Sequence, residues 1–339
     1  MTFLIAVVML GLIIFVHELG HFLTAKLFKM PVSEFSIGMG PQVFSVDTKN
    51  TAYSFRAIPI GGYVNIEGME VGSEVENGFS SKPAYQRFVV LFAGVFMNFL
   101  MAFILLFATA KISGRIEYDS NAIIGGLVKG GANEQILKVE DKILELDGKK
   151  INVWTDISKI TKSSQNKEEI SALIERNGKE ENITLKLTKD EENNRVVLGI
   201  SPKYKKINLS TTESLDFAKN SFNSIFTDTL KGFFTLFSGK ASLKEISGPV
   251  GIFKVVGEVS KFGWVSIISL CVVLSINIGV LNLLPIPALD GGRIIFVLLE
   301  LFGIKVNKKW EEKLHKGGMI LLLFFILMIS VNDVWKLFN

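Results

Sequence analysis

The chain has 339 residues, of which 48% are hydrophobic and 21% charged, and its net charge is +4. This composition is too apolar for an ordinary soluble protein and too charged for membrane spans alone, so it predicts membrane segments combined with a soluble part. Basic residues lie beside apolar runs rather than in one stripe, which argues against a nucleic-acid-binding protein. The single cysteine, Cys271, excludes an intrachain disulfide.

The first apolar run covers residues 2–25 and contains His-Glu-Leu-Gly-His at positions 17–21. Residues i and i+4 share one face of a helix, so His17 and His21 can bind one metal ion, with Glu18 beside it to take a proton from water. Ionisable side chains inside a membrane span are costly and are typically functional. We therefore predict a zinc-binding membrane helix over residues 1–28. A pair of buried histidines bonded to backbone or to Glu18 is the alternative.

Three further apolar runs, residues 87–111, 262–289 and 317–336, are long enough to cross a bilayer as helices, which takes about 20 residues. In the second run, Gly94 and Asn98 lie four positions apart, and we expect this face to lie against the first helix. Lysine and arginine are concentrated in the loops at residues 29–86 and 290–316. This predicts that both loops are cytoplasmic and that both termini and the middle region face outward.

The loop at residues 29–86 contains two strand-like stretches, residues 43–46 and 52–58, joined by Asp-Thr-Lys-Asn at positions 47–50. This pattern predicts a β-hairpin. Because its content is apolar, we expect the hairpin to pack on the membrane helices or to enter the membrane. Gly61 and Gly62 follow the second stretch.

The middle region has two parts. Residues 115–204 are charged and combine short strand patterns with one or two helical patterns, which predicts a small separate domain. Residues 210–240 place apolar residues at helical spacing with charged residues between them, and we expect an amphipathic helix on the membrane surface. A helix packed on the soluble domain is the alternative.

A catalytic zinc ion usually takes three protein ligands and leaves one position open. The third histidine, His315, lies among lysines, which suits a solvated loop. Asp290, at the end of the third apolar run, is the better candidate, because a buried carboxylate needs a partner and zinc supplies one. Capping of the following helix, residues 293–301, is the alternative role for Asp290.

The segment before Asp290 reads Asn-Leu-Leu-Pro-Ile-Pro-Ala at positions 282–288. Pro285 and Pro287 break a helix and free backbone groups, which a membrane protein tolerates where the backbone lines a polar cavity. Asn277 and Asn282 can bond a substrate backbone or stabilise an oxyanion. Packing between helices is the alternative for each asparagine.

The His-Glu-Leu-Gly-His motif, the Gly94–Asn98 pair and the segment at 282–292 together resemble the site-2 protease family of intramembrane zinc metalloproteases. The match is to its bacterial branch of regulator-of-sigma-E proteases, and it covers essentially the whole chain. The resemblance implies that His17, His21 and Asp290 bind one Zn²⁺ per chain. It also implies that Glu18 is the general base and acid and that Asn282 contacts substrate.

The resemblance further implies that residues 115–204 form one PDZ domain, which we expect to filter substrates by size. It also identifies the hairpin with the family's membrane-associated β element, which adds a strand to an extended substrate. The predicted substrate-binding residues are Asn282, Asn277, Pro285, Pro287, Gly61 and Gly62.

We therefore expect a polytopic α-helical membrane protein with four transmembrane helices, a membrane-associated β-hairpin and one extracytoplasmic PDZ domain. The expected location is a bacterial inner membrane, and the expected activity is zinc-dependent hydrolysis of peptide bonds within transmembrane segments, near the cytoplasmic side. The resemblance implies single-span substrates in the lipid bilayer, such as trimmed anti-sigma factors and remnant signal peptides. A catalytically silent PDZ scaffold and a transporter are the alternatives.

Overall fold

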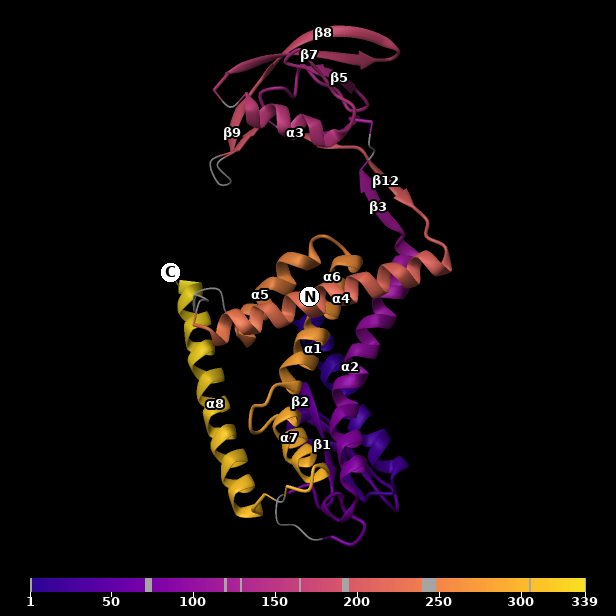
Figure 1. Cartoon of the computed structure of the whole chain (residues 1–339), viewed down its shortest axis with the longest axis vertical. Coiled ribbons are helices and arrows are strands. Elements are labelled where there is room, and N and C mark those ends of the chain that lie inside the picture. Colours follow the sequence, from indigo (N-terminus) through magenta and orange to yellow (C-terminus); the bar gives the residue numbers. More distant parts are fainter. Residues whose placement is uncertain are drawn as a thin grey trace. The chain divides into compact units, whose positions relative to one another are not determined.

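The computed structural model describes residues 2–70, 75–118, 121–128, 130–164, 166–190, 195–239, 248–304 and 306–338. Residues 71–74 of the predicted cytoplasmic loop and residue 240 of the predicted amphipathic helix lie outside this part. The chain divides into two compact units, one made of Met1–Lys111 and Thr211–Asn339 and the other of Ile112–Ser210 (Figure 1).

Four helices of the first unit are long and apolar enough to cross a membrane. They are α1 (Thr2–Leu27), α2 (Ala84–Ser113), α6 (Trp264–Leu283) and α8 (Lys308–Phe338). Among the described residues, the number of such helices therefore agrees with the four predicted spans. The third helix ends at Leu283 rather than at 289, because Pro285 and Pro287 cannot continue it. The fourth begins before its predicted start, at Lys308, and its charged first turns include a Lys316–Glu312 ion pair of 2.6 Å.

Small residues let the spans approach one another closely. A Cβ atom on Gly20 of α1 would lie 2.3 Å from the carbonyl oxygen of Ala93 in α2, and a Cβ on Gly279 of α6 would lie 2.5 Å from the ring of Phe99 in α2. Membrane helices pack by close van der Waals contact of this kind, since lipid offers no hydrophobic driving force between them. α2 therefore lies against both α1 and α6.

Two shorter helices belong to the same unit. α5 (Pro249–Ser260), which the sequence pattern did not predict, packs on the start of α1, where the rings of Phe3 and Phe253 stack 5.3 Å apart. α7 (Asp290–Leu301) covers the helix expected at 293–301 and, with the first turns of α8, occupies much of the predicted cytoplasmic loop at 290–316. α7 is helical because Ile294 and Val297 are buried in one apolar cluster with Ala25 of α1 and Val90 of α2.

The amphipathic segment forms α4 (Thr211–Phe237) and belongs to the unit of the four spans. Its phenylalanine rings pack on α2 and α6, and the centroids of Phe222 and Phe226 each lie 5.7 Å from that of Phe99. In Figure 1, α4 runs across α2 rather than alongside it. α4 therefore packs on two of the four long apolar helices.

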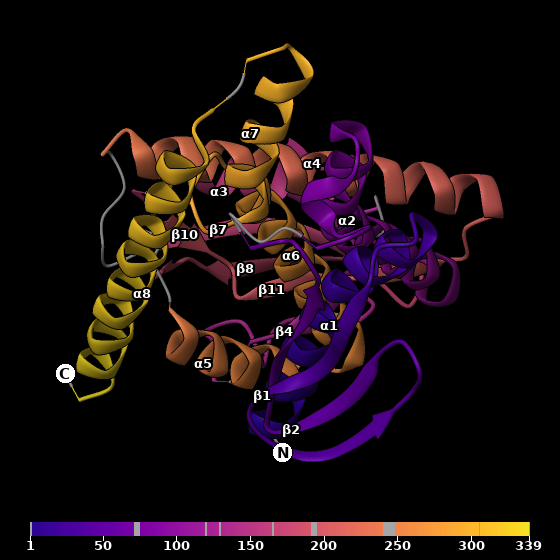
Figure 2. The same cartoon turned by 90° about the horizontal axis from the view of Figure 1, so that it is seen from below.

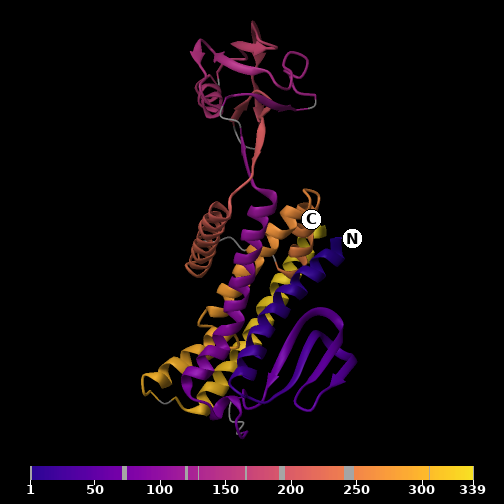
Figure 3. The same ribbon diagram turned by 90° about the vertical axis from the view of Figure 1, so that its right-hand side faces the viewer.

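The predicted β-hairpin is present and is longer than predicted. β1 (Val32–Asp47) pairs antiparallel with β2 (Ala52–Ile66), and β2 lies along α1 (Figure 3). Its turn is held by the Thr48 hydroxyl, which donates to the carbonyl oxygen of Thr51 at 2.7 Å. The far part of the hairpin exposes a row of apolar side chains: Met39, Val43, Phe44, Val46, Phe55 and Ile58.

α8 is the most exposed of the four spans, and none of its most apolar stretch is buried within the described part of the protein. It stands apart from α1 and α2 in Figures 1 and 2. At its C-terminal end the Asp333 carboxylate accepts the backbone N–H of Gly251 in α5 at 2.7 Å.

The second unit is a small α+β domain. A four-stranded antiparallel sheet has the order β6 (Lys149–Lys150), β5 (Lys142–Leu146), β7 (Glu169–Arg176) and β8 (Lys179–Lys186). Three two-stranded pairs complete it: β3 (Arg115–Tyr118) with β12 (Tyr204–Ile207), β4 (Ile124–Leu127) with β11 (Ile200–Pro202), and β9 (Thr188–Asp190) with β10 (Arg195–Val197). The one helix, among the residues described here, is α3 (Trp154–Ser163).

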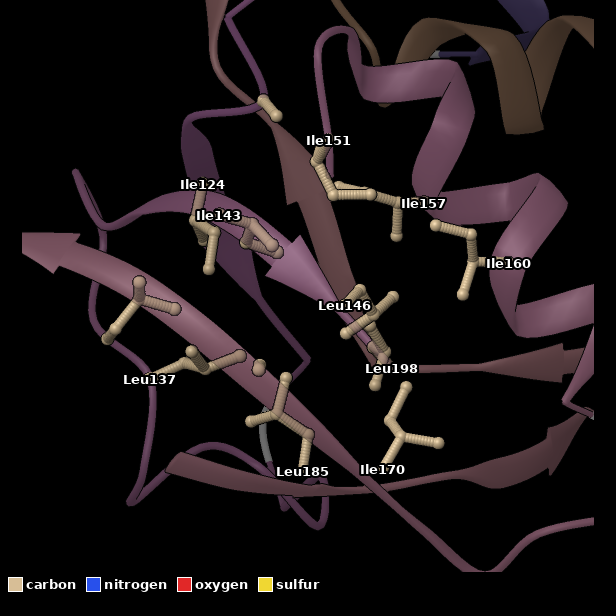
Figure 4. Close-up of a cluster of buried hydrophobic side chains, with 13 residues drawn as sticks. Ile124, Leu137, Ile143, Leu146, Ile151, Ile157, Ile160, Ile170, Leu185 and Leu198 are labelled. Carbon is tan, nitrogen blue, oxygen red and sulfur yellow. The ribbon is translucent and has the colours of Figure 1, made fainter. Parts of the chain in front are cut away.

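This second unit has its own hydrophobic core. Ile157 and Ile160 of α3 point toward Ile143 and Leu146 of β5, and Leu185 of β8 joins them (Figure 4). An ion pair adds to this packing. The Arg176 guanidinium donates to both carboxylate oxygens of the buried Asp141, at 2.8 and 2.6 Å. The predicted separate domain is thus confirmed as a packed unit.

Candidate metal centre and catalytic cleft

Three potential metal ligands from distant parts of the chain meet at one point. The Oδ2 atom of Asp290, the first residue of α7, lies 3.0 Å from His17 Nε2 and 3.3 Å from His21 Nε2. The two Nε2 atoms are 3.2 Å apart. Both histidines are buried, one helical turn apart on α1.

These residues fit zinc. A tetrahedral ion with bonds of about 2.0–2.1 Å holds its ligand atoms roughly 3.3 Å apart, which is the spacing seen here. Two imidazole nitrogens and one carboxylate oxygen are a donor set typical of catalytic zinc, which leaves a fourth position open. Glu18, the glutamate of the His-Glu-Leu-Gly-His motif, lies beside the three candidate ligands in the same cleft.

α2 supplies the partners that orient both histidines. His21 Nδ1 lies 2.8 Å from the carbonyl oxygen of Val90, so this nitrogen carries the proton and leaves Nε2 free to bind a metal. His17 Nδ1 lies 3.4 Å from the amide of Asn98, which is fully buried. This confirms that the Gly94–Asn98 face abuts α1.

Gly94 leaves the space that the two imidazole rings occupy. A Cβ atom at this position would lie 2.4 Å from His21 Nε2 and 2.8 Å from His17 Cε1. Any side chain on Gly94 would therefore displace the ligands themselves.

The segment that carries Asp290 is compact. Leu289 is the N-cap of α7 and Asp290 is its first helical residue, so Asp290 does not occupy the capping position of its alternative role. A Cβ atom on Gly291 would lie 2.3 Å from the Leu284 carbonyl oxygen, and one on Gly292 would lie 2.4 Å from that of Ile286. These two glycines let the start of α7 fold back onto the loop after α6.

The three candidate ligands line a cleft of about 470 Å³ between the apolar helices and the hairpin. Glu18 lines it, and its Oε2 atom accepts the backbone N–H of Val64 in β2 at 3.2 Å. Tyr63, Asn282, Arg293 and Met319 line the same cleft. The base candidate and the edge of the hairpin are thus in direct contact.

The sequence model of peptidase family M50 matches residues 5–325. The chain belongs to peptidase family M50, the site-2 proteases. A candidate zinc metalloprotease of Fusobacterium nucleatum is 93% identical over 339 residues, which is the full length of both chains. The Regulator of sigma-W protease RasP of Bacillus subtilis is 27% identical over 420 aligned positions, which cover 99% of each chain.

Among solved structures, a PDZ domain of an SdrC-like protein from Listeria monocytogenes is similar to 25% of this M50 chain, and the match covers 92% of that domain. Its TM-score is 0.23 and its sequence identity is 18%.

Of the predicted substrate-binding residues of this M50 protein, one lines the cleft and the others do not. Asn282 lines the cleft, whereas Asn277 does not: its side-chain oxygen accepts the Thr229 hydroxyl of α4 at 2.6 Å, as the helix-packing alternative has it. Pro285, Pro287, Gly61 and Gly62 also lie outside the cleft lining. The prolines shape the loop before Asp290, and the glycines precede the cleft-lining Tyr63.

The predicted place of His315 was wrong. It was expected in a solvated loop, but it lies on α8, and its Nδ1 atom accepts the backbone N–H of Ala288 at 3.1 Å. Arg293 and Met319 were missed as cleft residues. Only Arg293 had a signal in the sequence, since it is a charged residue three positions after a predicted metal ligand.

Proposed function

We propose that this chain is an intramembrane zinc protease that hydrolyses peptide bonds within the transmembrane segments of other membrane proteins. The observation that carries the proposal is the convergence of His17, His21 and Asp290, whose ligand atoms all lie within 4.8 Å of one another. Two of these residues are inside an apolar helix long enough to span a bilayer. A hydrolytic centre at that depth acts on bonds that lie in the membrane.

The three ligands would hold the zinc ion, which supplies the Lewis acidity that makes water nucleophilic at neutral pH and polarises a carbonyl. Glu18 would take the proton from the attacking water and return it to the leaving amine, in the manner of a general base and acid. Its contact with the Val64 N–H fixes the carboxylate at the mouth of the cleft. Asn282 is the candidate contact for the substrate backbone in this cleft.

The hairpin supports an extended substrate. A helix hides its peptide bonds in its own hydrogen bonds, so a transmembrane substrate must unwind before hydrolysis. β2 borders the cleft through Tyr63 and Val64, and a strand edge offers main-chain groups to an unwound segment. The exposed apolar side chains of the hairpin suit contact with lipid.

The membrane arrangement is also part of the proposal. The basic residues of loops 29–86 and 290–316 favour a cytoplasmic position for these loops, and the metal centre would then lie near the cytoplasmic side of a bacterial inner membrane. The second unit, which we propose to be a PDZ domain, and both termini would then face outward. Its proposed role is to exclude substrates whose outer part is too large.

Trimmed single-span anti-sigma factors and remnant signal peptides are the proposed substrates, in regulated intramembrane proteolysis. The Bacillus subtilis relative is named a regulator of sigma-W protease, which supports the first class. A catalytically silent scaffold would require a missing ligand or base, whereas this chain has His17, His21, Asp290 and Glu18 in place.

The test is Glu18→Gln in the full chain, reconstituted with a model single-span substrate. We expect cleavage to fall by about 10²–10⁴-fold, because the amide cannot accept the proton. Zinc content should stay near one ion per chain, since the three ligands are untouched. Retained cleavage in this variant, or a wild-type protein that binds no zinc, would refute the proposal.

A further inference from the structure

α8 contacts the loop that precedes Asp290 at two neighbouring points. His315 bonds the backbone of Ala288, and Gly318, on the next turn, packs on Pro287. Elsewhere α8 is the most exposed span, with its apolar stretch outside the core of the described residues. α8 is thus attached at this loop and, near its C-terminal end, through the Asp333–Gly251 hydrogen bond.

The Ala288 contact satisfies a backbone group in an unusual conformation. Ala288 has φ of +83°, in the left-handed region that residues with a side chain rarely adopt. Of the neighbouring amides, Ile286 and Leu289 bond within the loop, to Leu284 and Ile286. The N–H of Ala288 instead points out of the loop and is accepted by His315.

The Gly318 contact leaves no room for a side chain. A Cβ atom on Gly318 would lie 2.5 Å from Pro287 Cβ and 2.6 Å from the Pro287 carbonyl oxygen. The preceding glycine, Gly317, has nothing within 4 Å of the same position. Of this pair, only Gly318 is required for the close approach of α8 to the loop.

The histidine ring is held in one orientation. Because Nδ1 accepts from Ala288, the ring proton lies on Nε2, which is buried and has no partner among the described residues. The ring also packs on Phe296 of α7, with centroids 5.5 Å apart. A buried N–H donor without a partner is unfavourable. The hydrogen bond from Ala288 to Nδ1 is therefore kept even though it leaves the Nε2–H group in an unfavourable environment.

We propose that His315 is a positioning residue that, together with Gly318, fixes the loop from Pro285 to Leu289 and thereby holds Asp290 at the metal centre. Gly291 and Gly292 fix the α7 side of the same loop, and α8 fixes the opposite side. Asp290 is two residues from Ala288, so a rotation at Ala288 moves the carboxylate directly. This inference rests on the proposed role of Asp290 as a zinc ligand.

The first test compares His315→Asn with His315→Leu. Asparagine Oδ1 takes the place of histidine Nδ1, so it restores the acceptor for Ala288, whereas leucine fills the space without an acceptor. We expect zinc affinity, measured on the purified full chain by competition with a chromophoric chelator, to fall about 10-fold in the leucine variant. The asparagine variant should stay within about threefold of wild type, since it keeps the supporting hydrogen bond.

The second test uses the adjacent glycines as a matched pair. Gly318→Ala should push α8 away from Pro287 and lower zinc affinity by about 10-fold, while Gly317→Ala should leave it unchanged. Both substitutions add the same methyl group to the same helix, so a general effect on helix stability would appear in both. Thermal unfolding of the metal-free proteins checks that each variant is folded.

The outcomes separate the two proposals. Wild-type affinity in both His315→Leu and Gly318→Ala would overturn the positioning role while leaving the zinc site intact. Equal losses in His315→Leu and His315→Asn would overturn the hydrogen bond as its cause. A wild-type chain that binds no zinc would overturn the proposed function and this inference together.

Discussion

The side-chain amide of Asn98 can change its hydrogen bond to His17 when a metal ion binds. Its Oδ1 atom is buried without a hydrogen-bond partner in the part of the chain that the structure describes, while its nitrogen lies 3.4 Å from His17 Nδ1. When His17 Nε2 binds a cation, its proton must sit on Nδ1, which then needs an acceptor. A half-turn of the amide exchanges nitrogen for oxygen and supplies one.

Asn98→Ala should therefore weaken zinc binding by about 10–100-fold, because His17 loses the group that fixes its orientation. The measurement is zinc affinity of the purified chain. Asn277→Ala is the matched control, since Asn277 bonds α4 rather than a ligand. Equal affinities of wild type and Asn98→Ala would show that Asn98 only packs.

Single residues differ in how far the sequence reveals them. His17, Glu18 and His21 are predictable because helix geometry alone places i and i+4 on one face. Asp290 needed a chemical argument, namely that a buried carboxylate requires a partner. His315 could not be found, because its lysine neighbours point to solvent and its role depends on where α8 meets the loop.

Among the elements, the hairpin has the clearest internal stabilisation. The Glu34 carboxylate of β1 accepts hydrogen bonds from Ser54, Tyr63 and Arg56 of β2, the last at 2.8 Å. Burial alone raises the pKa of Glu34, but these bonds and the Arg56 charge outweigh it and hold the pKa below its ordinary value. The cluster ties the two strands together close to the cleft-lining Tyr63.

The sign of the pH effect follows from that lowered pKa. The carboxylate stabilises the folded hairpin fully above its ordinary pKa of 4.5, and this stability is lost as pH falls through the lower folded value. Glu34→Gln should destabilise the hairpin by up to about 1 kcal/mol at pH 7, since the partly exposed group is screened by solvent. At pH 3 the difference from wild type should shrink.

Hydrogen exchange of residues 32–66, compared between the two proteins at each pH, measures this effect. A difference of equal size at pH 7 and pH 3 would mean that the carboxylate charge is not its source.

Element boundaries follow local chemistry unevenly. The end of α6 at Leu283 is readable from Pro285 and Pro287, and the hairpin turn is readable from its polar residues. α5 was missed, since its residues 249–260 become a helix through packing on α1, where Phe253 meets Phe3. A contact between residues so far apart leaves no periodic signal in a short segment.

At the scale of the whole molecule, the proposed metal centre joins the first helix of the chain to a helix close to its end. Its proposed ligands come from α1 and α7, so a bound ion would cross-link two helices that otherwise meet through side-chain packing. Removing zinc with a chelator should lower the unfolding temperature, because a ligand at 1,000 times its Kd stabilises the folded state by about 4 kcal/mol.

Thermal unfolding in detergent, with and without chelator and after zinc is restored, tests this expectation. Asp290→Ala should unfold at the temperature of the chelated wild type and should not respond to chelator. A chelator effect of equal size in that variant would place the stabilising ion elsewhere.

The overall architecture was predictable where a physical constraint acts on sequence directly. Bilayer thickness sets the length of the four apolar runs, and the charged residues 115–204 mark the separate domain. The strand order of that domain was not predictable, because β4 pairs with β11 and β3 with β12 across most of the unit. Such long-range pairings are decided by the shared core rather than by local pattern.

The separation of His17 from Asp290, 273 positions along the chain, also has a consequence for biosynthesis. At about 5–20 residues per second, roughly 14–55 s pass between synthesis of His17 and synthesis of Asp290. During that interval α1 carries only two of the three proposed ligands. If these residues bind zinc as proposed, the chain becomes competent for hydrolysis only near the end of translation.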